Sequence, residues 1–506
     1  MDFPHPPTAP GGRSDRRRPL SPWEVALREV TGNPRPGGSR PPLTFVLPAS
    51  AQIPTPNREF LLSTPSEGVS YVATLAENMG WDVELVDMRL GVSAETAAAR
   101  AVSRGGVLAM PTFADSYAHN RRVLELVKEQ SPEMPAILGG TLVSSMPVPL
   151  MGALPADYAV LREGELTTLE LLEHLERGGS RQGAAGIEGL AVRFPDGRVH
   201  LTRHRSQIDD LDAVPIPDLF LYPSTKEDPR IPELGLTTAR GCYARCTFCY
   251  VNFPKMRFKS VPRVREELWD LKRKHQVEYI YINDLTFTSD LERARELCAV
   301  LGETGITWSC STRVEKASPD LLKEMHDSGC RDIWYGVESV DQRVLDLANK
   351  RQTVAQIREA IQRTMAAGIK VMTNFIIGLP GESKESLEAM VRFVEEEVVT
   401  PASVKYLSPF PGTPIYDDAI RRGVIRDPID YLEHLARRRV NDEADEIFNM
   451  TDLPDSMLRD AFRRLDGLRR SRVAEHFREP RQAAFGSELA AHESGKAASP
   501  TLKRAV

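Results

Sequence analysis

The chain has 506 residues, of which 41% are hydrophobic, and its formal net charge is -6. This length suffices for two or three domains with separate cores, and the apolar content indicates a globular protein rather than a disordered one. The slightly acidic balance disfavours nucleic-acid binding, and no apolar run approaches the ~20 residues that span a bilayer. Six cysteines without a disulfide framework indicate a reducing compartment, so we expect a cytoplasmic protein without a membrane partner.

The N-terminal part of the chain changes character near residue 43. Residues 1–42 are rich in Pro, Gly and Arg and predict a flexible leader with one helical piece over 22–27. From 43 to 178 apolar strand-like runs alternate with helical periodicity, which predicts a doubly wound, Rossmann-like α/β domain. In such a domain ligands bind at the carboxyl ends of the strands. The five predicted strands cover residues 43–47, 83–87, 106–110, 136–138 and 158–161.

The middle of the chain predicts a connector and then a second α/β unit. Residues 179–229 form the connector, in which alternating segments on either side of Pro195-Asp196-Gly197 indicate a β-hairpin. Residues 230–425 repeat a strand and a helix six times, which predicts a six-stranded partial (β/α)6 barrel with polar side chains at its strand ends. The six predicted strands cover residues 235–240, 279–282, 306–310, 332–335, 371–377 and 404–407.

The structure of residues 426–506 is predicted from their charge and composition. Residues 426–480 predict a helical C-terminal region that covers the barrel mouth or packs on its side. Residues 481–506 are rich in Ala, Ser and Gly and predict a disordered tail.

A cluster of cysteines follows the first predicted barrel strand. Cys242, Cys246 and Cys249 have the spacing C-x3-C-x2-C. Thiolates are the usual ligands of iron–sulfur clusters, and a 4Fe–4S cube normally takes four, so three in one loop leave one iron open to another ligand. Two plainer interpretations stay open, namely buried thiols in a core and a zinc site with a fourth ligand from elsewhere. The other three cysteines are expected in the core, and they are Cys298, Cys310 and Cys330.

The cysteine spacing, with the aromatic Phe248 before the last cysteine, resembles the signature of the radical S-adenosylmethionine (SAM) superfamily. The resemblance runs from residue 234 to 416, since the core of that family is a six-stranded partial barrel. It implies a 4Fe–4S cluster on the three cysteines, with SAM on the open iron. It further implies SAM-binding side chains at or near the strand ends, namely Phe248, Tyr250, Asp284, Arg313, Glu338, Lys350, Ile376 and Glu382. Arg351 is an alternative to Lys350, and these charged residues have plainer interpretations as helix caps or solvated side chains.

The N-terminal unit resembles the cobalamin-binding domain that precedes many radical SAM cores. The matching features are the Gly139-Gly140-Thr141 loop and the run Glu163-Gly164-Glu165-Leu166-Thr167. The resemblance implies cobalamin contacts from Ser63, Thr64, Thr112, Gly139, Gly140, Thr141, Glu163, Gly164 and Glu165. The sequence lacks the D-x-H-x-x-G motif whose histidine ligates cobalt, so we expect no such ligand on the lower face. A domain that packs without binding any cofactor is the alternative.

Together the two resemblances imply a cobalamin-dependent radical SAM methyltransferase acting in a biosynthetic pathway. It would methylate an unactivated carbon or phosphorus centre of a small molecule or peptide and take electrons from a flavodoxin- or ferredoxin-type donor. Cyclases and rearrangement enzymes of the same family use cobalamin without methyl transfer, and this alternative stays open. Methylthiotransferases resemble the chain less, because they carry a second cluster on N-terminal cysteines and no cysteine precedes Cys242. From another class, a non-catalytic iron–sulfur protein is the alternative; the oligomeric state is not indicated.

Overall fold

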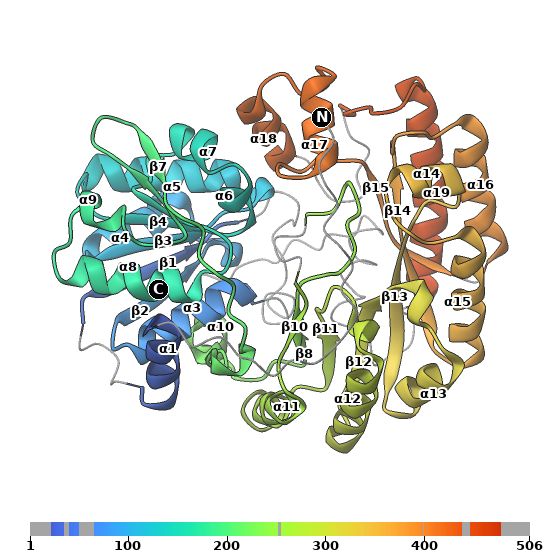
Figure 1. Ribbon diagram of the computed structural model, residues 1–506, viewed down its shortest axis with the longest axis horizontal. Helices are drawn as coiled ribbons and strands as arrows, with labels where there is room; N and C mark the ends of the chain where they lie inside the picture. The colour runs from blue at the N-terminus through green and yellow to red at the C-terminus, as the bar shows by residue number, and fades with distance from the viewer. Residues whose placement is uncertain are drawn as a thin grey trace, which may run out of the picture.

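The structure is a computed structural model that describes residues 22–34, 40–49, 65–250, 255–397, 399–437 and 446–476. Figure 1 shows two α/β units beside each other, the N-terminal unit in blue to green and the C-terminal unit in green to orange. The predicted tail lies outside the described residues, as does the predicted leader up to residue 21. Within the described ranges, no helix combines the length and the apolar character that crossing a membrane requires.

The N-terminal unit is built on a seven-stranded sheet with the order β2-β1-β3-β4-β5-β6-β7. Strands β1 to β5 pair in parallel, and β6 and β7 extend the sheet by antiparallel pairing. The strand order reverses between β1 and β3, and sheets of this kind bind ligands at such a switch point. The prediction of a doubly wound domain is therefore confirmed. The strands are β1 (Pro42–Leu47), β2 (Asp82–Asp87), β3 (Val107–Pro111), β4 (Ala136–Gly139), β5 (Tyr158–Val160), β6 (Leu190–Arg193) and β7 (Val199–Leu201).

Helices cover both faces of this sheet. On β1, Phe45 belongs to one hydrophobic cluster and its neighbour Val46 to another, which is why the strand is a continuous apolar run. Helix α4 begins at Ser93, whose hydroxyl oxygen accepts a hydrogen bond from Thr96 N at 3.1 Å. The helices are α1 (Pro22–Gly32), α3 (Glu67–Asn78), α4 (Ala94–Arg104), α5 (Tyr117–Gln130), α6 (Thr141–Ser145), α7 (Pro147–Ala153), α8 (Glu165–Glu176) and α9 (Arg181–Ala184).

Two segments that were predicted to be peripheral belong to the N-terminal unit. Helix α1, inside the predicted flexible leader, packs against α3 and α8, and Leu27 is 1% exposed. The hairpin of β6 and β7, inside the predicted connector, pairs with β5 and widens the sheet. The sequence hides both contacts because a short helix or hairpin is stabilised mainly by the surface it packs on.

The second unit is a six-stranded parallel sheet with the order β15-β14-β13-β12-β11-β8, which confirms the predicted partial barrel. The strands are β8 (Glu233–Leu236), β11 (Tyr279–Ile282), β12 (Thr307–Thr312), β13 (Cys330–Glu338), β14 (Lys370–Ile377) and β15 (Thr400–Tyr406). The helices between them are α11 (Val261–His275), α12 (Leu291–Thr304), α13 (Pro319–Asp327), α14 (Gln342–Leu347), α15 (Val354–Ala366) and α16 (Lys384–Glu396). The short helix α10 (Pro223–Glu227) precedes this unit.

The first barrel strand differs from its prediction over residues 235–240. β8 ends at Leu236, and the chain then turns into a separate strand, β9 (Ala239–Arg240). β9 pairs antiparallel with β10 (Arg257–Phe258), so the cysteine loop leaves the barrel and returns to it at one place.

The C-terminal helices connect the two units. They are α17 (Pro414–Arg421), α18 (Pro428–Arg437) and α19 (Asp455–His476). Figure 1 shows α17 and α18 between the units at the top of the view. Leu432 and Ala436 of α18 enter a core cluster of the N-terminal unit, and Glu433 pairs with Arg121 of α5. Helix α19 lies along β15 and α16, where Phe462 stacks on Tyr406.

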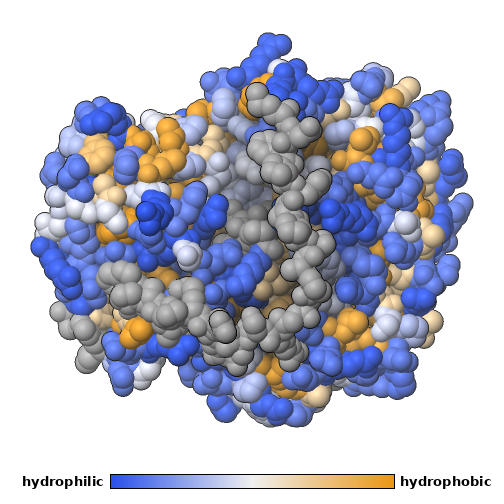
Figure 2. Space-filling view, in the orientation of Figure 1, coloured by the Kyte–Doolittle hydropathy of each residue, from blue (hydrophilic) through white to orange (hydrophobic). Residues whose placement is uncertain are grey.

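The outer face shown in Figure 2 is mainly hydrophilic, with apolar residues in small separate groups. Most large apolar side chains instead lie in the cores of the two units, where Trp81, Trp308 and Phe375 are almost fully buried.

Candidate functional site

Asp284, which follows β11, holds the start of the cysteine loop by hydrogen bonds. Its carboxylate accepts hydrogen bonds from Thr238 N at 2.6 Å, Thr238 Oγ1 at 2.6 Å and Ala239 N at 2.8 Å. Asp284 was predicted to contact SAM from a strand end. The structure instead uses both of its oxygens to turn the chain from β8 into β9, so this residue supports the loop.

The three predicted ligands lie close to one another. Cys242 and Cys246 are each 9% exposed, and Cys249 N donates a hydrogen bond to Cys246 O at 3.1 Å. The pKa of the Cys249 thiol is raised to about 12, first by desolvation and then by the sulfurs of Cys246 and Cys242. Among the described residues no group of three Cys, His, Asp or Glu side chains converges on a single ion. In a 4Fe–4S cube each thiolate binds a different iron, so three cysteine ligands need not converge on one point.

The other three cysteines are core residues, as predicted. Cys298 on α12, Cys310 on β12 and Cys330 on β13 are all buried within the main hydrophobic cluster of the barrel. The pKa of the Cys298 thiol is raised to about 12, mainly by burial.

Three of the residues predicted to bind SAM meet beside the loop. Lys350 Nζ lies 3.0 Å from Glu338 Oε1 and 5.7 Å from the centre of the Phe248 ring. The loop is fixed here because Thr247 N donates to Ala348 O at 3.0 Å. The pair fills the space above Gly336, where a Cβ atom would lie 2.6 Å from Glu338 Oε1 and 2.8 Å from Lys350 Nζ.

Backbone strain marks the same place. Glu338, Asn349 and Arg351 have φ angles of 64°, 50° and 53°, a left-handed conformation that non-glycine residues rarely adopt. Asn349 is held by its own side chain, whose amide donates to Arg245 O in the loop at 2.6 Å. Arg351 contacts Asn349 and is exposed, so Lys350 and not Arg351 is the cation beside Phe248.

Arg313 anchors this arrangement from the end of β12. Its Nε donates to Glu315 Oε1 at 2.5 Å, and Nη2 donates to Lys350 O. Glu315 also accepts hydrogen bonds from Tyr243 OH at 3.1 Å and from Gln352 Nε2 at 2.9 Å. Sequence reasoning missed Glu315, Tyr243 and Gln352. The only local signal was the spacing of Arg313 and Glu315, two residues apart.

Ile376 and Glu382 lie at the end of β14. Ile376 packs beside Phe248 on the cluster around Leu407. Glu382 is 6% exposed and accepts a hydrogen bond from Gly378 N at 2.8 Å, so it stabilises the turn after the strand. Burial raises the pKa of Glu382 to about 8, because the two backbone donors at Gly378 and Leu379 do not offset the loss of hydration.

The stability of the protein is therefore expected to decrease with rising pH near neutrality. The folded chain keeps the Glu382 proton up to about pH 8, whereas the unfolded chain loses it near the ordinary pKa of 4.5. Between these values the unfolded state binds fewer protons, so this group lowers the free energy of unfolding by at most ~1.4 kcal/mol per pH unit. Glu382→Gln should remove this contribution and stabilise the protein at pH 8, as measured by denaturant unfolding at pH 5 to 8. A variant with an unchanged pH profile would contradict the assignment.

A cavity of about 440 Å³ lies at the carboxyl ends of β1, β3, β4 and β5. Its wall is largely apolar, and it includes Gly139, Gly140, Thr141, Glu163, Gly164 and Glu165, all predicted to contact cobalamin. A Cβ atom on Gly139 would meet nothing within 4 Å, so the missing side chain widens the cavity. Gly140 has a φ angle of 99°, and a Cβ atom there would lie 2.9 Å from Thr112 O. A mainly apolar pocket with a few polar groups at its edge is typical of a binding site for a small molecule or cofactor.

The remaining predicted cobalamin contacts are placed differently. Thr112 is fully buried behind the cavity, where its hydroxyl accepts a hydrogen bond from Asn120 Nδ2 at 2.9 Å. Ser63 and Thr64 lie outside the described residues. The cavity continues onto the barrel through Thr237, Arg240, Gly241, Asn283 and Leu285, and so it reaches the residue before Cys242.

The two glutamates of the cavity wall are bound by arginines of the barrel. Glu163 accepts hydrogen bonds from Arg257 Nη1 at 2.7 and 2.8 Å and from Arg240 Nη1 at 3.0 Å. Glu165 accepts one from Arg240 Nη2 at 2.6 Å. Both glutamates were predicted as cofactor contacts, and in the structure they bind Arg240, Arg257 and, for Glu163, also the backbone N of Ile208. Sequence reasoning missed Arg240 and Arg257, although they stand directly on either side of the cysteine loop.

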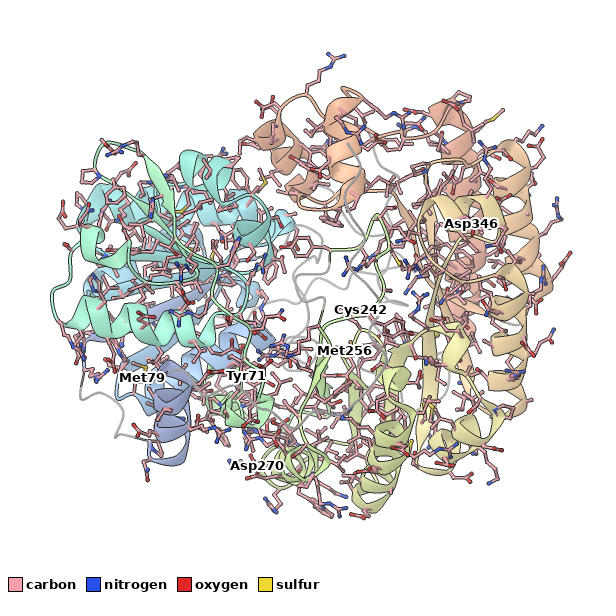
Figure 3. The ribbon with its side chains drawn as sticks, viewed as in Figure 1. Tyr71, Met79, Cys242, Met256, Asp270 and Asp346 are labelled. Atoms are coloured by element: carbon pink, nitrogen blue, oxygen red, sulfur yellow. The ribbon has the colours of Figure 1, made fainter. Side chains whose placement is uncertain are left out.

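The cysteine loop reaches the N-terminal unit at a second point. Tyr250, predicted to contact SAM, donates a hydrogen bond from its hydroxyl to Thr141 O. A second cavity, of about 410 Å³, adjoins this contact and is bordered by Phe113 and Phe410. Figure 3 shows Cys242 and Met256 of the loop and Tyr71 of α3 at the boundary of the two units.

Comparison with known families assigns both units. A model of the Radical SAM superfamily matches residues 236–394, and a model of the B12 binding domain matches residues 57–172. The first range contains the three cysteines and most of the barrel, and the second contains the glycine loop and the Glu163–Glu165 run.

The chain also resembles individual proteins over most of its length. It is 30% identical over 336 residues to an uncharacterized methyltransferase of Pyrococcus horikoshii, covering 63% of this chain and 72% of that protein. It is 26% identical over 436 residues to the cytidylyl-2-hydroxyethylphosphonate methyltransferase of Streptomyces wedmorensis, covering 74% and 80%. The radical SAM methyltransferase TsrM from Kitasatospora setae shares the fold, with a TM-score of 0.62 at 17% identity over 77% of this chain and 80% of that chain. The chain therefore belongs to the cobalamin-dependent radical SAM enzymes, whose cofactors are a 4Fe–4S cluster, SAM and cobalamin.

Proposed function

We propose that this enzyme is a methyltransferase that places a methyl group on an unactivated carbon or phosphorus centre of a small molecule or peptide. One observation carries the proposal. The cavity at the strand ends of the N-terminal unit extends to Gly241, next to the first cysteine of the loop. A methyl carrier in that cavity and a radical generated at the cysteine loop would then act on one substrate between the two units.

The residues of the chain would divide the work as follows. When bound, the three cofactors supply one-electron reduction, a carbon-centred radical from SAM, and methyl transfer. Cys242, Cys246 and Cys249 hold the cluster. Glu338 and Lys350 are oriented by Arg313 and Gly336 to receive the polar methionine end of SAM, and Phe248 offers a face for its adenine. The electron comes from an external donor, for which a flavodoxin- or ferredoxin-type protein is the proposed partner.

The second cavity is the proposed substrate site. Phe113 of the N-terminal unit, Tyr250 of the cysteine loop and Phe410 after β15 surround about 410 Å³. Phe113 and Phe410 are 38% and 40% exposed, so two aromatic rings face open space between the units. Such side chains favour a substrate with a planar or apolar portion.

The experiment is anaerobic reconstitution of the full chain with iron, sulfide and hydroxocobalamin, followed by incubation with SAM and a reductant. The proposal predicts ~4 Fe per chain, the absorption spectrum of bound cobalamin, and formation of both 5′-deoxyadenosine and S-adenosylhomocysteine. The second product is the signature of methyl donation by SAM. Cluster binding without cobalamin binding would overturn the proposal.

The same two products distinguish methyl transfer from a second candidate reaction. Relatives of this chain include an anaerobic magnesium-protoporphyrin IX monomethyl ester cyclase of Rubrivivax gelatinosus, so cyclisation or rearrangement is the alternative reaction. Formation of 5′-deoxyadenosine in the presence of bound cobalamin, with no S-adenosylhomocysteine, would favour that alternative over methyl transfer.

A further inference from the structure

The strongest charge cluster between the two units lies outside the cofactor roles assigned above. It consists of Glu163 and Glu165 of the N-terminal unit with Arg240 and Arg257 of the barrel, and is called here the ion-pair clamp. All four side chains are largely buried, from 2% exposed for Arg257 to 14% for Arg240. Burying charges costs desolvation energy, so a buried ion pair is weak evidence for stability, and fixing one geometry is a role established for such pairs in some proteins.

The clamp joins both arms of the cysteine loop. Arg240 stands two residues before Cys242, and Arg257 stands directly opposite Arg240 in the ladder of β9 and β10. Like charges in opposed positions destabilise an antiparallel pair. The carboxylate of Glu163 accepts hydrogen bonds from both guanidinium groups and so offsets this repulsion. The base of the cysteine loop is therefore completed by a residue of the other unit.

A second group of contacts holds the same two arms. Lys259, just after β10, donates to Tyr71 OH of α3 at 2.8 Å and pairs with Glu267 at 2.6 Å. The guanidinium of Arg240 lies 5.2 Å from the centre of the Tyr71 ring. Thr237, before β9, donates from its hydroxyl to Glu67 Oε2 at 2.6 Å. The arms are thus bound at several points, and the contacts to Tyr71 and Glu67 lead to α3, which lines the cavity of the N-terminal unit.

The glutamates of the clamp also form part of the wall of that cavity. Glu163, Gly164 and Glu165 line it directly, together with Tyr71 and Arg240. Any ligand that fixes the cysteine loop must fix Arg240 and Arg257, and hence the wall segment that they hold. Conversely, a ligand that fixes the wall segment favours the loop geometry in which the arginines are paired.

We propose that the ion-pair clamp couples the two cofactor sites, with Glu163 and Arg240 as positioning residues for both. Assembly of the cluster preorganises the cavity for cobalamin, and bound cobalamin stabilises the cluster loop by the same factor, as thermodynamic linkage requires. The inference rests on the proposed function only in taking cobalamin as the ligand of the cavity. It does not depend on the substrate or on whether a methyl group is transferred.

The test compares hydroxocobalamin binding to the full chain with and without its cluster, by titration under absorption spectroscopy. For the wild type the dissociation constant is expected to be about tenfold lower with the cluster, within the ordinary range of coupling between sites. Glu163→Gln should bring the ratio of the two constants to about one. The matched control is Glu170→Gln on helix α8, which begins two residues after Glu163, because Glu170 pairs with Arg205 inside the N-terminal unit, and it should keep the wild-type ratio.

A reciprocal measurement uses the cluster itself. Loss of iron to a chelator, followed at the cluster's absorption band, should be slowed by hydroxocobalamin in the wild type and in Glu170→Gln, but not in Glu163→Gln. Arg240→Lys keeps the charge but loses the two-pronged geometry that reaches both glutamates, so it should behave like Glu163→Gln. It also serves as the test if Glu163→Gln does not give folded protein by circular dichroism.

The outcomes separate this inference from the proposed function. Cobalamin binding of equal strength with and without the cluster in the wild type would overturn the clamp and leave the proposed function standing. So would an unchanged ratio in folded Glu163→Gln or Arg240→Lys. Failure of the wild type to bind cobalamin in either form would overturn both.

Discussion

Replacement of Cys246 by alanine is expected to abolish the iron–sulfur cluster and all cleavage of SAM. Cys246 is the middle one of the three proposed ligands and is buried, and the other three cysteines of the chain lie in the hydrophobic core and not in the loop. The iron content after anaerobic reconstitution should fall from ~4 per chain to near zero, and 5′-deoxyadenosine should not form. Iron analysis, absorption spectroscopy and product analysis measure these three quantities.

A matched control separates this effect from a general loss of cysteine. Cys298→Ala removes a buried thiol on α12, within the barrel core, and should cost about 1 kcal/mol of stability as a small cavity in the core. It should keep the full iron content and the SAM cleavage of the wild type. Normal activity in Cys246→Ala would remove the three-cysteine assignment, whatever the control shows.

Lys350→Met is expected to have the second-largest effect, on both stability and SAM binding. Lys350 and Glu338 are 6% and 8% exposed, so removal of the lysine leaves a buried carboxylate without its cation. Breaking a buried pair from one side costs about 3 to 5 kcal/mol. The midpoint of denaturant unfolding should fall accordingly, and the affinity for SAM, measured by equilibrium binding to the reconstituted protein, should fall with it.

The double variant Lys350→Met, Glu338→Gln distinguishes the two effects. It leaves no unpaired charge, so most of the lost stability should return. SAM binding should remain weak, because the cation and carboxylate proposed to receive the methionine end are both gone. A double variant that binds SAM as the wild type does would show that the Glu338–Lys350 pair stabilises the strained turn and is not part of the cofactor site.

Local patterns were sufficient for much of the molecule. The cysteine spacing, the alternation of apolar strands and helices, and the glycine pair after β4 each depend on residues close together in the chain. Since hydrogen-bond geometry and side-chain periodicity act over a few residues, these signals predicted both α/β units, the glycine edge of the cavity and the cysteine loop. The resemblance to the radical SAM superfamily implied that Phe248, Glu338 and Lys350 contact one cofactor, and the structure brings these three side chains together.

The same reasoning did not reveal contacts that depend on a distant partner. Asp284 follows a strand end, as a cofactor ligand would, yet its oxygens turn the chain at Thr238 and Ala239. Glu163 and Glu165 lie in a cavity wall, and both also pair with Arg240, 77 and 75 positions away. The sequence predicted helix α1 as part of a flexible leader and α18 as part of a C-terminal region, but both helices pack on the N-terminal unit. In each case the sequence shows which chemical group is present, and the packing of the folded chain determines which residue that group contacts.

The sequence by itself therefore determined the two folds and the spacing of the three cysteines proposed to hold the cluster, because these follow from spacing and periodicity. Only the tertiary structure decided how the units are joined. The charges of Glu163, Arg240 and Arg257 are visible in the chain, but burial at a shared boundary is what turns them from solvated side chains into a fixed contact. Desolvation strengthens an interaction between charges and penalises any that is left unpaired, and it is a property of the assembled fold.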